Sequence, residues 1–99
     1  MSNEVRAAHI LCSFDKYGKE EAFKKIQDIE TEIENGSDFA ELAKAHSDCP
    51  SGSRGGDLGT FGRGAMVAEF EATAFSLEIG KISTPTETEF GFHLIQRTE

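Results

Sequence analysis

Apolar residues dominate the run VRAAHILC at positions 5–12. An apolar run with β-branched residues is typical of a β-strand, in which successive side chains point to opposite faces. A period of two places four residues on one face of this strand: Val5, Ala7, His9 and Leu11. The sequence therefore predicts an N-terminal strand with a histidine on one of its faces.

The apolar period changes to three and four residues from Glu20 onward, which is typical of one face of a helix. The members of this apolar stripe are Ala22, Phe23, Ile26, Ile29 and Ile33. Gly36 is suited to the position after the last helical residue, where a left-handed backbone is common. We expect this helix to pack its stripe against a sheet.

A second helix is predicted to begin at Ser37 or Asp38, since Glu41 completes a capping-box pattern with Asp38. It should end near Ser47. Glycine, serine and charged residues then dominate positions 48–64, which predicts a shaped loop followed by a short strand.

Residues 66–77 return to a helical pattern, and Gly80 marks the end of this helix or the turn beyond it. The apolar positions of this pattern are Met66, Val67, Phe70, Ala74 and Phe75. Pro85 limits any strand that forms around it. Residues 90–97 predict a final strand, on which His93 alternates with apolar neighbours.

The order of these elements favours an α+β fold with an antiparallel sheet, because the strands do not alternate regularly with crossover helices. A chain of 99 residues fits a single domain, here residues 1–99. Eight phenylalanines among the apolar residues are enough to fill one core.

A formal net charge of −8 argues against nucleic acid and anionic membranes as partners, since both require a basic face. The N-terminus lacks the apolar stretch of a signal peptide, so we expect a cytoplasmic protein unless a leader precedes this sequence. We also expect a monomer. Cys12 and Cys49 form no CxxC motif and are expected to be reduced. We expect no metal, and the glycines of positions 52–64 contain no nucleotide-binding motif. No cofactor is therefore expected.

Five blocks, in this order and spacing, resemble the parvulin family of peptidyl-prolyl cis/trans isomerases. They are AHIL at 8–11, FAELA at 39–43 followed by SDCPS at 47–51, GGDLG at 55–59, FGRGAMV at 61–67 and FGFHLI at 90–95. Any one block is a weak signal. Together they extend the resemblance from about residue 6 to residue 98.

This resemblance implies a parvulin (FKBP-like) fold, in which about four helices surround a four-stranded antiparallel sheet with the site on its concave face. It assigns four residues to a catalytic polar cluster: His9, Cys49, Thr88 and His93. It assigns three residues to a pocket for the proline ring, Leu58, Met66 and Phe70, with Phe61 supporting them. Proline-containing peptides and unfolded or partly folded proteins are the implied substrates.

The expected chemistry needs no covalent step, because an apolar pocket weakens the charge-separated resonance form of the imide bond. A nucleophilic role for Cys49 stays open, although the family's acceptance of Asp at this position argues against it. Residues 13–19, which we expect to form a loop after the first strand, lack the arginine cluster of phosphate-directed members. Arginine suits bidentate phosphate capture better than lysine does, so apolar residues before proline are expected to be preferred over phosphorylated ones.

Two other function classes remain open alongside the isomerase. The same pocket could hold unfolded proline-containing segments without catalysis, as a binding or chaperone module does. Cys49 with His9 or His93 could instead form a hydrolase site. A third, purely structural interpretation is that the two histidines only join their strands, and that Met66 and Phe70 belong to the core.

Overall fold

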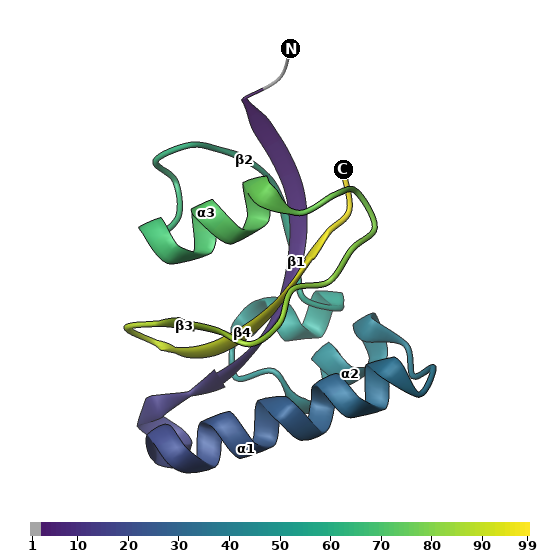
Figure 1. Cartoon of the computed structure of the whole chain (residues 1–99), viewed down its shortest axis with the longest axis vertical. Coiled ribbons are helices and arrows are strands. Elements are labelled where there is room, and N and C mark those ends of the chain that lie inside the picture. The colour runs from purple at the N-terminus through teal and green to yellow at the C-terminus, as the bar shows by residue number, and fades with distance from the viewer. Residues whose placement is uncertain (1–2) are drawn as a thin grey trace.

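The computed structural model describes residues 3–99 and shows one sheet with helices on both of its faces (Figure 1). In chain order the elements are β1 (Glu4–Ser13), α1 (Phe14–Glu34), α2 (Phe39–His46), the 3₁₀ helix η1 (Pro50–Arg54), β2 (Asp57–Gly62), α3 (Ala68–Ser76), β3 (Thr86–Thr88) and β4 (Gly91–Arg97). The strand order is β2-β1-β4-β3, and each neighbouring pair is antiparallel. The α+β class and the four-stranded antiparallel sheet are therefore confirmed.

The alternation along β1 divides the interior into two clusters, one on each face of the sheet. Ala8, Ile10 and Cys12 pack with the buried faces of α1 and α2. Val5 and Ala7 point the other way and pack with α3. Because the period of a strand is two, His9 continues the α3 face, which puts a polar residue between apolar layers.

The first helix begins earlier than the sequence predicted, at Phe14 rather than near Glu20. Ser13 caps it, because its side chain accepts a hydrogen bond from the backbone N–H of Asp15. Gly18, with φ of +72°, interrupts the helix, which explains why no continuous apolar stripe is visible in this part of the sequence. The expected loop at 13–19 is thus a helical turn that ends in a kink.

The predicted stripe of α1 is only partly buried. Ala22, Ile26 and Ile29 are buried against the sheet as expected. Phe23 is instead 41% exposed and lies beside Phe92, with 5.0 Å between the ring centroids. Phe23 therefore stands at the margin of the stripe.

The remaining boundaries agree with the sequence to within a few residues. Asp38 caps α2 by accepting from the backbone N–H of Glu41 at 3.1 Å. The α3 helix begins at Ala68, two residues later than expected, because Val67 has an extended backbone and forms its N-cap. No helix within residues 3–99 combines the length and the apolar character that a membrane span requires.

Candidate active site

The two predicted histidines meet between the central strands. In the β1–β4 register His9 lies opposite Ile95, and Leu11 lies opposite His93, so the histidines are diagonal neighbours on one face. Their Nδ1 atoms are 2.9 Å apart. The ring centroids are 5.1 Å apart with an interplanar angle of 18°, which fits nearly coplanar rings that share one in-plane hydrogen bond. The pair is joined edge to edge rather than by face-to-face stacking.

Thr88, at the end of β3, extends this pair into a chain of three side chains. Its Oγ1 lies 2.7 Å from Nε2 of His93 and also accepts the backbone N–H of Phe90 at 3.2 Å. If the Thr88 hydroxyl donates to His93, then His93 donates through Nδ1 to His9. The opposite direction leaves the buried hydroxyl hydrogen without an acceptor, so the first arrangement is favoured.

Burial keeps both imidazoles neutral. His9 and His93 are only 5% and 4% exposed. Burial lowers the pKa of His9 to about 4. Burial together with the neighbouring His9 lowers the pKa of His93 to about 3. Near neutral pH the pair is therefore an uncharged, polar element within an apolar surrounding.

Phe70 of α3 covers the histidine pair. Its ring centroid is 5.4 Å from each imidazole centroid, and its plane is at 81° to both rings. Phe61 of β2 packs behind Phe70 at 6.2 Å and does not line the pocket. Phe61 thus contacts Phe70 from outside the pocket lining.

A pocket of about 500 Å³ opens beside the histidine pair. The predicted residues Leu58, Met66 and Phe70 come together in its wall, from β2, from the segment before α3 and from α3. The complete lining consists of His9, Leu11, Asp48, Cys49, Pro50, Leu58, Ala65, Met66, Val67, Phe70, Phe90 and His93. Most of these side chains are apolar, which suits a small apolar ring as ligand.

Cys49 lies in the pocket wall, just before η1, and is partly exposed. Its backbone N–H donates to Oγ of Ser47 at 3.4 Å. Within residues 3–99 its thiol makes no hydrogen bond, so the network predicted from the sequence joins His9, His93 and Thr88 but not Cys49. Both cysteines are free, and burial raises the pKa of Cys12, on the opposite face of β1, to about 11.

Six pocket residues were missed at the sequence level: Leu11, Asp48, Pro50, Ala65, Val67 and Phe90. Leu11 could have been found, because the strand period puts it on the same face as His9. Phe90 is 55% exposed although it is aromatic, and no periodic pattern indicates that it faces the pocket. Its position depends on a tertiary hydrogen bond, from the backbone N–H of Phe14 to its carbonyl oxygen at 3.0 Å.

Asp48, the charged residue in the pocket lining, is already paired. Asp48 accepts the backbone N–H of Ser13 at 2.9 Å and forms an ion pair with Lys16 at 3.4 Å. Lys19 is paired with Glu87 at 3.1 Å. Across the described part of the chain, no three His, Cys, Asp or Glu side chains gather closely enough to hold a metal ion.

Comparisons with known proteins identify the family. A family model described as "Rotamase: PPIC-type PPIASE domain" matches residues 9–99. The chain is 42% identical over 97 residues to the Foldase protein PrsA of Geobacillus kaustophilus, covering 97% of this chain and 32% of that protein. It is 48% identical over 81 residues to the Peptidyl-prolyl cis-trans isomerase pin1 of Rhizopus delemar, covering 81% of this chain and 54% of that protein. The chain thus spans about a third of the length of the first relative and about half of the second.

A solved structure agrees with the whole fold. The solution structure of TbPIN1 superimposes with a TM-score of 0.90 at 36% identity, covering 100% of both chains. The family model and this structure each match most or all of the chain. The chain therefore belongs to the PPIC-type, or parvulin, family of peptidyl-prolyl cis-trans isomerases.

Proposed function

We propose that this domain accelerates rotation about Xaa-Pro bonds by binding the proline ring noncovalently in the pocket beside the histidine pair. The observation that supports this most directly is the apolar pocket of about 500 Å³ that borders two neutral, buried imidazoles. Peptides and unfolded or partly folded proteins are the proposed substrates. The name of the Geobacillus relative, a foldase, supports proteins as substrates.

The proposed mechanism acts on the resonance of the imide bond. Its partial double bond sets a rotation barrier of ~18–20 kcal/mol, and the planar form is more charge-separated than the twisted one. Leu58, Met66 and Phe70 hold the ring and exclude water, which disfavours the planar form. A barrier lowered by ~5 kcal/mol gives an acceleration of several thousandfold.

The hydrogen-bonded chain from Thr88 through His93 to His9 has a proposed polar role. It fixes the tautomers of both rings and sets the electrostatic field on the side of the pocket where the two imidazoles lie. Neither ring needs to gain or lose a proton during rotation. Cys49 contributes to the wall of the pocket and has no obligatory chemical step.

We further propose that apolar residues are preferred before the proline. Lys16 and Lys19 are each paired with a carboxylate, so a phosphate would have to displace Asp48 or Glu87. Phe90 presents a half-exposed aromatic ring beside the pocket, where it can contact an apolar neighbour of the proline.

A peptide panel tests this preference. With a protease-coupled assay, kcat/KM should be higher for Leu-Pro and Phe-Pro peptides than for a phosphoserine-Pro peptide. Phe90→Ser should reduce kcat/KM for Phe-Pro by about three- to tenfold, because it removes the aromatic contact. Phe23→Ser, which changes another exposed phenylalanine outside this pocket, serves as the matched control and should leave kcat/KM unchanged. Faster turnover of the phosphorylated peptide by the wild type would contradict the proposal.

The hydrolase alternative depends on Cys49, so its substitution separates the two activities. Cys49→Asp should retain isomerase activity within about tenfold, because the noncovalent mechanism needs no thiolate. Alkylation by iodoacetamide, followed by mass spectrometry, gives an independent measure of thiol reactivity. Complete loss of isomerase activity in a folded Cys49→Asp variant, together with rapid alkylation of the wild-type thiol, would favour covalent chemistry.

A further inference from the structure

Leu58, one of the pocket residues, lies on an irregular part of β2. The β1–β2 register pairs Arg6 with Thr60 and Ala8 with Asp57. One residue of β1 therefore faces two residues of β2, which is a β-bulge at Leu58 and Gly59. Since a bulge interrupts the hydrogen-bond ladder, the ladder alone does not fix the direction of the Leu58 side chain.

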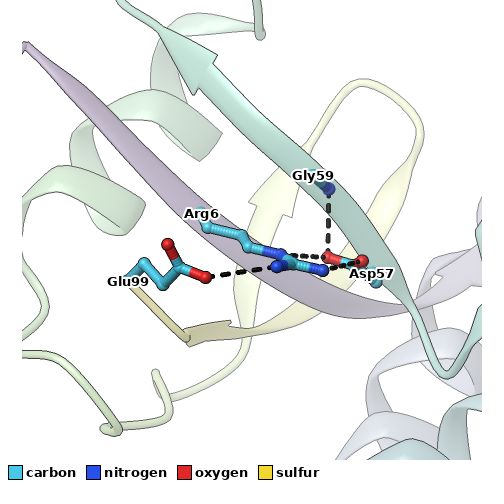
Figure 2. A network of polar contacts seen from close by, with 4 residues as sticks. All are labelled: Arg6, Asp57, Gly59 and Glu99. Atoms are coloured by element: carbon cyan, nitrogen blue, oxygen red, sulfur yellow. Dashed lines mark hydrogen bonds and ion pairs between the residues drawn. The ribbon is translucent and has the colours of Figure 1, made fainter.

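The carboxylate of Asp57 ties this bulge together (Figure 2). Nε and Nη2 of Arg6 donate to its two oxygens at 3.2 and 2.7 Å, in a bidentate arrangement. The same carboxylate accepts the backbone N–H of Gly59 at 3.0 Å, across Leu58. Gly59 has φ of +73°, a conformation that glycine adopts without steric cost.

Arg6 is held from its other side by the end of the chain. Its Nη1 donates to a carboxylate oxygen of Glu99 at 3.1 Å, as Figure 2 also shows. The backbone carbonyl of Arg6 accepts the N–H groups of Thr98 and Glu99. Arg6 thus also makes contacts that do not involve Asp57, through its backbone and through Nη1.

We propose that Arg6 and Asp57 are positioning residues for the proline pocket, which act by fixing the bulge that presents Leu58 to the substrate. Neither residue lines the pocket, so their effect on substrate must pass through the backbone of β2. This inference rests on the proposed function, because it assumes that Leu58 contacts the proline. The pair is 42% and 34% exposed in its side chains, and such ion pairs contribute little to stability. If this ion pair had only a structural role, its removal would change stability slightly and would leave substrate binding almost unchanged.

Steady-state kinetics with a Leu-Pro peptide test the inference. Arg6→Gln and Asp57→Ala should each raise KM about fivefold and change kcat less than twofold, because a misplaced wall weakens binding of all states of the ring. The double variant should be no worse than either single variant, since the two residues act as one unit. Glu99→Gln is the matched control: it removes the other carboxylate from Arg6, leaves the Asp57 contact and should keep KM within twofold of the wild type.

Methyl NMR reports the environment of the Leu58 side chain in the pocket wall directly, and this measurement does not require catalysis. Its resonances should shift in Arg6→Gln and Asp57→Ala but not in Glu99→Gln, and Arg6→Lys provides a milder variant that keeps the charge. Unchanged KM and unchanged Leu58 resonances in folded variants would overturn the inference, as would an equal rise of KM in Glu99→Gln. Lack of isomerisation by the wild type would instead count against the proposed function, while the NMR comparison still decides whether the pair positions Leu58.

Discussion

At the scale of single residues, the site depends on a contrast between polar atoms and the environment in which they are buried. His9 and His93 satisfy each other through one Nδ1–Nδ1 hydrogen bond, and Thr88 completes the chain. Nε2 of His9 is buried and has no hydrogen-bond partner within residues 3–99. Such an unpaired polar group costs free energy on folding.

The lowered pKa values of the two histidines predict a pH-dependent stability. Above the unfolded-state pKa of 6.5, both states hold the imidazoles neutral, and their full contribution to stability is present. As the pH falls toward the folded-state values of about 4 and 3, only the unfolded chain takes up protons. The free energy of unfolding should therefore fall by about 1 kcal/mol per histidine between about pH 7.5 and pH 5.5.

Urea unfolding at these two pH values, followed by circular dichroism, measures this loss. His46→Gln is the control, because it keeps both buried imidazoles and should lose as much stability as the wild type. A His9→Asn variant that folds should lose less, since only one buried histidine remains. A stability that does not change from pH 7.5 to about 5.5 would contradict the assigned protonation states.

At the scale of elements, periodicity was a good guide wherever a whole face of a strand or helix is buried. The alternation of β1 predicted which residues share one face of the strand, and the stripe of α1 predicted Ala22, Ile26 and Ile29 as buried. The start of α1 at Phe14 could not be seen, because Gly18 breaks the period. The family resemblance assigned Leu58, Met66 and Phe70 to one pocket, whereas helical spacing alone would have assigned Phe70 to the core.

Close approach between elements explains what periodicity does not show. Gly56 has φ of +84°, and its carbonyl accepts the backbone N–H of His9 at 2.9 Å. A Cβ atom at this position would overlap the carbonyl oxygen of His9. The turn before β2 therefore packs directly on the strand that carries the site.

Substitution of this glycine should damage both stability and activity. Gly56→Ala should cost roughly 3 kcal/mol or more and lower kcat/KM, because backbone strain is combined with displacement of His9. Gly36→Ala is the matched control, since Gly36 also has a positive φ, of +101°, but open space around its Cβ position. It should cost only about 1–2 kcal/mol and leave kcat/KM unchanged. Equal losses in the two variants would show that the close approach to His9 is unimportant.

At the scale of the whole molecule, the two faces of the sheet have different tasks. The α1 and α2 side buries a purely apolar cluster, whereas the α3 side combines its apolar cluster with the pocket and the histidine pair. The chain as a whole carries a formal net charge of −8. This charge should attract basic segments of a client chain and repel acidic ones.

Peptides of one Leu-Pro core with different flanking residues test this long-range effect. At low salt, kcat/KM should be about three- to tenfold higher with lysine flanks than with glutamate flanks. The difference should nearly vanish at about 0.5 M salt, where screening shortens the range of the interaction to a few ångström. A serine-flanked peptide is the control and should respond little to salt. A charge preference that persists at high salt would instead indicate direct contacts.

The proposed acceleration of Xaa-Pro rotation depends on the apolar pocket bounded by Phe70 and needs no covalent chemistry. Its most direct test is the cis-to-trans rate of a Leu-Pro peptide, measured with micromolar wild-type protein and with Phe70→Ala at equal concentration. The wild type should accelerate the interconversion well above the uncatalysed rate, and Phe70→Ala, with folding verified by circular dichroism, should lose most of that acceleration. No acceleration by the wild type, or an undiminished rate in a folded Phe70→Ala variant, would contradict the account.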